Sequence, residues 1–157
     1  MDTPIIVEPD QAQVYNLGLG EAHILVDGAR SAGAWWLGEF REDPGFMTPM
    51  HFHPQQDEHF YVLDGVLALY FAGKWLDIHP GTYATIPHGV EHAQGNTSDH
   101  PVKFLAAGNP AGFEKVFAEL DLLFKRISRT DPQFQIEGGK ILAKYDTKVV
   151  SPPPRRT

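Results

Sequence analysis

The stretch from Gly45 to Gly65 reads GFMTPMHFHPQQDEHFYVLDG, and it carries most of the information about the fold. It places His51 and His53 two positions apart, so that both imidazoles point to the same face of a strand. The turn-forming run PQQD follows, and Glu58 then begins a segment in which apolar residues alternate. A hairpin of this kind would direct both histidines and Glu58 into the same interior.

A second stretch, from Gly81 to Asn96, reads GTYATIPHGVEHAQGN and contains His92. Because His92 lies far along the chain from His53, only a closed or folded-over sheet would bring the two together. Three imidazoles and one carboxylate suit a divalent transition metal such as Fe, Ni, Mn, Co or Zn. We therefore predict one such metal ion per chain, with the ligands His51, His53, Glu58 and His92.

Each of these residues also has a simpler interpretation. Two histidines that flank one residue are often a surface pair, and a single glutamate is usually solvated; the joint spacing favours the metal site. His59 follows Glu58 directly, so it should point to the opposite face and serve a structural or interfacial role. Asp57 lies in the turn and should be solvated. We expect the remaining histidines at the surface: His23, His79, His88 and His100.

The composition is that of an ordinary globular domain. The chain has 157 residues, of which 42% are hydrophobic and 21% charged, with a net charge of -7. The absence of a basic patch argues against a nucleic-acid partner. The chain has no cysteine, which excludes disulfides and thiolate metal ligands. Neither a secretory signal nor a membrane-spanning segment is visible, so we expect a soluble, cytoplasmic protein without a membrane partner.

Short β-prone runs separated by turn signals occupy residues 14–107. The Asp64-Gly65 pair between two apolar runs is a strong hairpin signal. Evenly spaced short strands favour an all-β sandwich or barrel. The runs that we expect to form strands are His23–Val26, Ala34–Phe40, His59–Leu63, Val66–Phe71, Thr82–Ile86 and Val102–Ala107.

After Gly108 the pattern becomes helical. Asn109 and Pro110 are suitable as a helix cap and first helical residue. Apolar residues then recur on one helical face, which predicts a helix packed against the outside of the barrel. A second short helix is expected from Gly138 to Tyr145 within the segment 109–146, and the Pro-rich tail 151–157 should be extended or disordered. We predict a single domain over residues 1–157. The residues on the expected helical face are Phe113, Val116, Phe117, Leu120, Leu123 and Phe124.

The two quoted stretches resemble the two signature motifs of the cupin superfamily. The first motif has Gly, five residues, His-x-His, a short gap, Glu, six residues and Gly; the second has Gly, five residues, Pro-x-Gly, two residues, His, three residues and Asn. The resemblance implies a double-stranded β-helix, or jelly-roll, barrel of two facing sheets. It also implies that His51, His53, Glu58 and His92 are the metal ligands, with positions left open for water, O2 or substrate.

A narrower resemblance concerns the region after the second motif. The run from Gly108 to Phe113, the following helix and the Pro-rich tail are similar to single-domain cupins related to the quercetin 2,3-dioxygenases. This resemblance implies a non-haem oxidoreductase of secondary metabolism that uses O2 on a flavonol-like or other enolic aromatic or polyketide substrate. In it, Glu58 would be both ligand and base. The alternatives are an oxygen-independent cyclase, isomerase or decarboxylase, and a non-catalytic small-molecule-binding cupin.

Large apolar residues on the expected strands are candidates for a substrate pocket, although each of them also suits plain core packing. Trp36 is the strongest candidate, because alternation places it on one face with Ala34 and Gly38. Its neighbour Trp35 would face a subunit interface. By resemblance we expect a homodimer, with the segment Ile5–Val7 crossing to the partner. The candidate pocket residues are Trp36, Phe40, Met50, Phe60, Tyr70, Tyr83 and Phe104.

Overall fold

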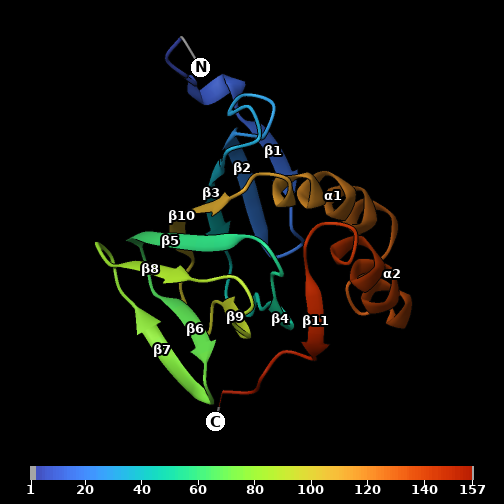
Figure 1. The fold of residues 1–157 in the computed structure, drawn as a ribbon. Helices are drawn as coiled ribbons and strands as arrows, with labels where there is room; N and C mark the ends of the chain where they lie inside the picture. Colours follow the sequence, from blue (N-terminus) through green and yellow to red (C-terminus); the bar gives the residue numbers. More distant parts are fainter. Residues whose placement is uncertain (1–2, 157) are drawn as a thin grey trace.

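The computed structural model describes residues 3–156, which form two antiparallel sheets that face each other (Figure 1). The six-stranded sheet has the order β1 (Gln13–Asn16), β2 (Gly20–Val26), β3 (Trp36–Glu42), β10 (Val102–Asn109), β5 (Asp57–Asp64) and β8 (Tyr83–Ile86). The five-stranded sheet has the order β11 (Lys148–Ser151), β4 (Met50–Phe52), β9 (His92–Gly95), β6 (Leu67–Phe71) and β7 (Lys74–Ile78). This arrangement confirms the predicted jelly roll.

The six expected runs correspond to β2, β3, β5, β6, β8 and β10, with boundaries that differ by a few residues. The other strands have no counterpart among those runs. β4 and β9 are only three and four residues long, too short to show an alternating pattern of their own. β11 forms because it pairs with β4 at the edge of the smaller sheet, a partner that is remote in sequence.

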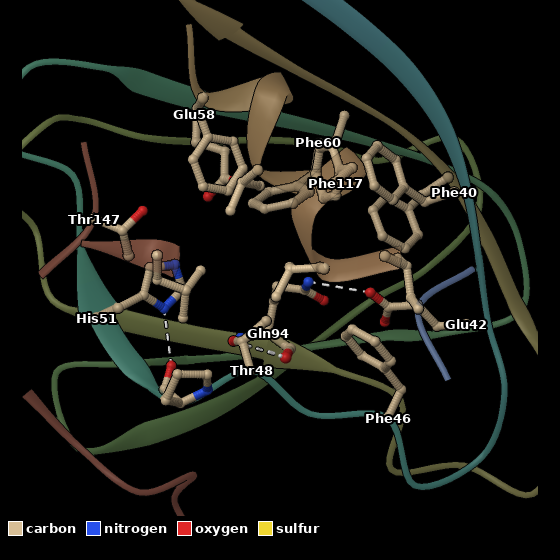
Figure 2. A pocket seen from close by; sticks show the side chains of 18 of the residues that line it. Phe40, Glu42, Phe46, Thr48, His51, Glu58, Phe60, Gln94, Phe117 and Thr147 are labelled. Carbon is tan, nitrogen blue, oxygen red and sulfur yellow. Dashed lines mark hydrogen bonds between the residues drawn. The ribbon is translucent and has the colours of Figure 1, made fainter. Parts of the chain in front are cut away.

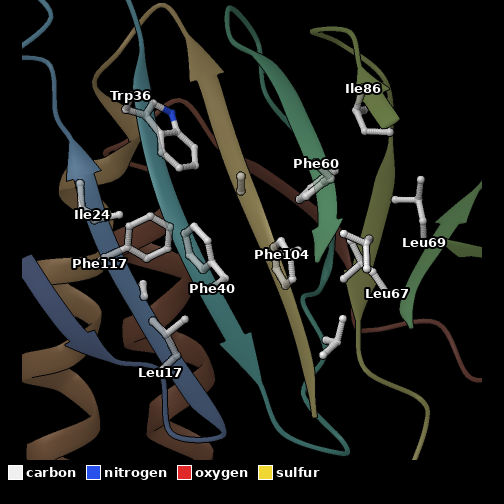
Figure 3. Close-up of a cluster of buried hydrophobic side chains, with 14 of the residues drawn as sticks. Leu17, Ile24, Trp36, Phe40, Phe60, Leu67, Leu69, Ile86, Phe104 and Phe117 are labelled. Carbon is white, nitrogen blue, oxygen red and sulfur yellow. The ribbon is translucent and has the colours of Figure 1, made fainter. Parts of the chain in front are cut away.

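The interior between the sheets is filled by side chains at alternate strand positions (Figure 3). On β3, Trp36, Gly38, Phe40 and Glu42 are all buried, whereas the residues between them are more exposed. The ring of Phe40 stacks on that of Phe104 from β10 with the ring centroids 5.4 Å apart. Aromatic pairs of this kind add to the burial of apolar area, so β3 and β10 form the rigid centre of the larger sheet.

The helical segments begin at other residues than the sequence pattern predicts. β10 continues through Asn109, because Asn109 pairs with Asp57 on β5, so the expected helix start at Asn109 and Pro110 is wrong. A 3-10 turn, Phe113–Lys115, leads instead into α1 (Val116–Arg126). α2 (Pro132–Leu142) begins six residues before the expected position, capped by Asp131, whose side chain accepts a hydrogen bond from the backbone N–H of Gln133 at 2.8 Å.

Both helices lie outside the two sheets, as expected: α1 lies beside β1, and α2 lies against α1 and β11 (Figure 1). α1 has a further role, because its apolar face also closes one side of the interior. Val116 and Phe117 of α1 are buried and belong to the same apolar cluster as Phe40 and Phe104. The helix therefore forms one wall of the space between the sheets.

Within residues 3–156, no helix is long and apolar enough to cross a membrane. Another 3-10 turn, Pro9–Gln11, precedes β1. At the other end of the chain, β11 runs antiparallel to β4 and the Pro-rich segment then continues without helix or strand. The Arg156 guanidinium donates to both carboxylate oxygens of Asp77 on β7, at 2.6 and 2.8 Å, and ties the tail to the smaller sheet.

Candidate metal centre

The structure brings the four predicted ligands together. His51, His53, Glu58 and His92 each offer one ligand atom, and these atoms lie within 4.8 Å of one another. All four side chains are buried. His51 on β4 lies directly opposite His92 on β9 in the register of the smaller sheet. Glu58 reaches the same point from β5 in the larger sheet.

The expectation that one hairpin supplies three of the ligands is wrong. β4 and β5 belong to different sheets, and the intervening segment Pro54–Gln56 carries the chain from one sheet to the other. His53 lies immediately after β4, at the start of this crossing. The cluster therefore joins the two sheets, so its geometry depends on how they pack together.

Backbone carbonyl groups orient the three imidazoles. The Nδ1–H groups of His51, His53 and His92 donate to the carbonyl oxygens of Pro49, Asp146 and Val90 at 2.8, 2.9 and 2.9 Å. Because a carbonyl oxygen can only accept, each Nδ1 carries a proton, and each Nε2 can present a lone pair when its ring is neutral. In a metal-binding histidine, one ring nitrogen binds the metal and the N–H of the other normally donates to a carbonyl or carboxylate oxygen, as here.

The charges of the cluster favour a cation at its centre. Burial opposes ionisation of Glu58, but the imidazoles of His53 and His92 outweigh that effect and hold the pKa of its carboxyl well below the usual range. Burial, together with the neighbouring His92, lowers the pKa of His51 to about 4, so this imidazole is neutral at pH 7. Burial also opposes protonation of His53, yet contact with the Glu58 carboxylate raises its pKa overall.

These residues fit a divalent metal ion. Nε2 of His92 lies 3.0 Å from Oε2 of Glu58, and Nε2 of His53 lies 3.7 Å from the same oxygen. Nε2 of His53 is buried and has no hydrogen-bond partner within residues 3–156. Lone pairs that converge on a carboxylate inside a buried site are costly unless a cation lies among them. The donor set of nitrogen and oxygen atoms suits first-row transition metals.

Asp146, just before β11, supports this cluster and was not anticipated from the sequence. Its carbonyl oxygen accepts from Nδ1 of His53, and its carboxylate accepts from the backbone N–H groups of Gln55 and Gln56 at 3.0 and 2.9 Å. The residue thus holds both the His53 ring and the crossing segment that follows it. No local pattern around residue 146 indicates this role, because its partners lie about ninety positions away.

We expect Asp146→Gly to weaken metal binding by about 10- to 100-fold, the usual effect of losing an outer contact of a metal site. The exchange removes the carboxylate that holds Gln55 and Gln56 just after His53, while the backbone carbonyl that accepts from His53 remains. Glycine is the suitable replacement because the φ of Asp146 is 48°, a left-handed conformation that glycine adopts without strain. Asp146→Asn is the matched control, since its amide oxygen can still accept from the crossing segment. Competition with a coloured chelator measures the affinity, and equal affinities of the glycine variant and the original protein would contradict this role.

A cavity of about 120 Å³ adjoins the ligand cluster, and His51 and Glu58 form part of its wall (Figure 2). Four of the seven predicted pocket residues line it: Trp36, Phe40, Phe60 and Phe104. The turn before α1 and α1 itself add further aromatic rings: Phe113, Phe117 and Phe124. Trp36 is fully buried, and its indole N–H donates to the side-chain oxygen of Gln56 at 2.7 Å. The cavity wall is therefore mainly aromatic.

The other three predicted pocket residues do not line the cavity, so these assignments are wrong. Met50 precedes the inward-facing His51 on β4, and alternation turns its side chain the other way. Tyr70 packs against Trp75 with the ring centroids 5.1 Å apart. Tyr83 is 57% exposed, and its hydroxyl lies 2.7 Å from Nδ1 of His59.

The remaining polar residues of the motifs lie away from the cluster. His59 contacts Tyr83 and the Asn109 side chain on the outer face of the larger sheet, opposite to Glu58. Asp57 is half-exposed and accepts from the backbone N–H of His88 at 2.8 Å. The metal-ligand cluster contains none of the four histidines expected at the surface: His23, His79, His88 and His100.

Among the further polar residues that line the cavity, Glu42 and Gln94 have no counterpart among the residues predicted for the site. Glu42 is 1% exposed and ends β3, and Gln94 lies on β9 two residues after His92. The amide of Gln94 donates to the Glu42 carboxylate at 3.1 Å. Burial raises the pKa of Glu42 to about 8, against the opposing effect of this hydrogen bond. Alternation from Phe40 and His92 would have placed both residues inside.

Residues 38–108 match the model of the Cupin domain family, and this range contains all four ligands of the cluster. The chain therefore contains a cupin domain. The family match runs from β3 to β10, so it includes strands of both sheets and leaves out β1, β2 and β11.

Among curated proteins, this cupin is similar to a germin-like protein of Arabidopsis thaliana, subfamily 2 member 5. The two are 36% identical over 69 residues, which are 41% of this chain and 32% of the plant protein. This cupin therefore spans about a third of the length of that relative.

Solved structures share the fold of this cupin. The polyketide cyclase RemF from Streptomyces resistomycificus has a TM-score of 0.59 and 24% identity, over 68% of this chain and 80% of that one. A sugar phosphate isomerase from Silicibacter pomeroyi has a TM-score of 0.55 and 23% identity, over 66% and 74%. A predicted oxalate decarboxylase from Thermotoga maritima has a TM-score of 0.56 and 23% identity, over 67% and 98%. At these identities the similarity concerns the fold alone.

Proposed function

We propose that this cupin is a metal-dependent dioxygenase that acts on a flavonol-like or other enolic aromatic or polyketide substrate. One observation carries the proposal. Two residues of the cluster, His51 and Glu58, also line a cavity whose wall is mainly aromatic. A divalent metal ion held by the four ligands would supply Lewis acidity and a template for the substrate and O2. The donor set suits Fe, Ni, Mn, Co or Zn and does not select among them.

In this proposal Glu58 is the base. Its carboxylate is ionised and lines the cavity, so it can accept the proton of an enolic hydroxyl group. When the substrate binds as an organic anion in a dry site, its negative charge raises the pKa of the Glu58 carboxyl, which favours transfer of the proton to Glu58. The oxygen that receives the proton would then hold the substrate by a hydrogen bond.

The apolar residues of the cavity would orient the substrate and exclude water. Phe60 and Phe104 come from the larger sheet, and Phe117 comes from α1. Flat rings from two sides suit an aromatic substrate, since offset and edge-to-face contacts are favourable. Exclusion of water also protects an electron-rich intermediate from side reactions.

The homodimer stays a prediction. In the single chain, Ile5 and Val7 line a shallow apolar groove together with Leu25, Trp35 and Leu37 on the outside of the larger sheet. This groove includes Trp35, the residue expected at a subunit interface. Light scattering at micromolar concentration would test the dimer, and a monomer would contradict it.

The second candidate is an oxygen-independent cyclase, isomerase or decarboxylase. A polyketide cyclase shares the fold over 80% of its chain, so a reaction of this class is compatible with such a barrel. The same four ligands would then hold a metal ion that acts only as a Lewis acid. A cupin that binds small molecules without catalysis is a third candidate.

The deciding experiment measures metal content and oxygen consumption together. We would purify the protein without chelators or added metal, determine its metals by mass spectrometry, and follow O2 uptake with quercetin. We expect close to one metal ion per chain and O2 consumption that matches the loss of quercetin. Conversion of quercetin or of a polyketide enol without O2 uptake would favour the second candidate. Binding without any product, under aerobic and anaerobic conditions, would favour the third.

A further inference from the structure

The cavity has a second polar end that the metal ligands do not account for. Glu42 and Gln94 lie there, and Figure 2 shows Glu42 on the opposite side of the view from His51 and Glu58, with Gln94 between them. Glu42 occupies an inward position of β3 that alternation would assign to an apolar residue like Phe40. A carboxyl group at such a position requires an explanation.

Both residues carry an unpaired buried oxygen. The amide of Gln94 donates to Oε1 of Glu42, but Oε2 of Glu42 and Oε1 of Gln94 have no hydrogen-bond partner in the described part of the chain. Buried polar atoms are normally paired, and leaving them unpaired lowers stability. Two such atoms beside one cavity are available to pair with a polar group of a ligand that enters it.

The surroundings define which group this ligand presents. The neighbouring side chains of the cavity, Phe40 and Phe46, are apolar, and no lysine or arginine is among the residues that line it. Burial in this setting favours the neutral carboxyl form of Glu42, since burial raises its pKa to about 8 and the charge of Glu58 adds to the effect. A neutral carboxyl group donates one hydrogen bond, and the oxygen of Gln94 accepts one. Together they match a hydroxyl group, which both accepts and donates.

We propose that Glu42 and Gln94 bind a phenolic hydroxyl group of the substrate at the end of the cavity remote from the metal ligands. The proposal rests on the proposed function and narrows it: preferred substrates are enolic aromatics with a further hydroxyl on a distant ring position. Glu42 is then a residue that determines specificity and positions the substrate, while Glu58 accepts the enolic proton.

Two flavonols test this assignment by binding alone, without turnover. Quercetin carries several phenolic hydroxyl groups, whereas 3-hydroxyflavone keeps only the enolic hydroxyl beside the carbonyl. Under anaerobic conditions we expect the protein as purified to bind quercetin at least about 10-fold more tightly than 3-hydroxyflavone, because the hydroxyl pairs two otherwise unpaired buried groups. In Glu42→Leu the preference should fall below about 3-fold, mainly through weaker binding of quercetin.

Two controls separate recognition from general damage. Glu21→Leu makes the same exchange at an exposed position of β2 and should keep the original preference. Metal content of Glu42→Leu should match that of the original protein, and thermal unfolding should change little, since removal of an unpaired buried oxygen offsets the loss of the hydrogen bond from the Gln94 amide. An equal loss of affinity for both flavonols, or an unchanged preference, would overturn the proposal.

The outcomes also distinguish this assignment from the proposed reaction. If quercetin drives O2 uptake but Glu42→Leu still binds quercetin more tightly than 3-hydroxyflavone, the dioxygenase proposal is supported and the hydroxyl site at Glu42 and Gln94 is contradicted. If Glu42→Leu abolishes the preference and no O2 is consumed, the hydroxyl site stands and the dioxygenase assignment falls. If neither flavonol binds the original protein, the substrate class and the hydroxyl site both fall.

Discussion

Replacement of His92 by alanine is expected to remove stoichiometric metal from the purified protein and to lower turnover by at least about 100-fold. His92 is 0% exposed, and its Nδ1 is held by the Val90 carbonyl, so its Nε2 has a single orientation. Without this ring, the site keeps the other three ligands, and the Glu58 carboxylate loses its contact at 3.0 Å. A buried carboxylate that has lost a partner also destabilises the fold.

The matched control for this change is His79→Ala, because His79 is exposed and lies outside the metal-ligand cluster. Metal per chain by mass spectrometry and thermal unfolding should be measured for both variants after the same purification. The control is expected to keep its metal and its activity. Full metal occupancy in a folded His92→Ala protein would show that the four-residue cluster is not the metal site.

Glu58→Gln is expected to reduce turnover per bound metal ion by about 10²- to 10⁴-fold, the usual contribution of a general base. Glutamine has nearly the same shape, but its amide cannot accept the proton of an enolic hydroxyl group. Glu58 is buried beside the aromatic cavity. Among residues 3–156, no second carboxylate belongs to the cluster with His53 and His92, so none would replace it. Some loss of metal is also expected, because an amide oxygen is a weaker ligand than a carboxylate.

The measurement should therefore report turnover relative to the metal that each preparation contains. Glu91→Gln provides the control, since Glu91 is exposed and directly precedes a ligand, so it tests the same exchange close to the site. Unchanged turnover per metal ion in Glu58→Gln would mean that Glu58 serves as a ligand only. That result would contradict the proposed dioxygenase mechanism with Glu58 as base and would favour a reaction in which the protein supplies no base.

Local patterns and the two motifs were sufficient to predict the fold class and the four residues that meet in one cluster. Two histidines separated by one residue share a face of any strand, and that holds for His51 and His53 whatever the rest of the chain does. Alternation likewise placed Phe40 and Phe104 in the interior, where the structure has them. The helix capped by Asp131 was also accessible in principle, since the Asp-Pro pair that starts it is visible in the sequence.

Alternation fails where a strand is short or where its inner face is not known in advance. Met50 was assigned to the pocket although its neighbour His51 points there, and two adjacent strand residues cannot share a face. Tyr83 was assigned inward, but Ile86 is the buried residue at the end of its strand. Glu42 was overlooked for the opposite reason, because a glutamate at the end of a strand is usually solvated.

The sequence by itself determined which residues can bind a metal ion, because these are residue types at short, regular spacings, and its two motifs predicted the jelly-roll barrel through their resemblance to those of cupins. Only the tertiary structure decided that His51 and Glu58 come from different sheets, that Asp146 holds His53, and that Glu42 shares the cavity with Gln94. The Glu42–Gln94 and Asp146–His53 contacts join positions 52 and 93 residues apart. Such contacts follow from how two sheets and a helix close around one interior, and no local periodicity encodes that closure.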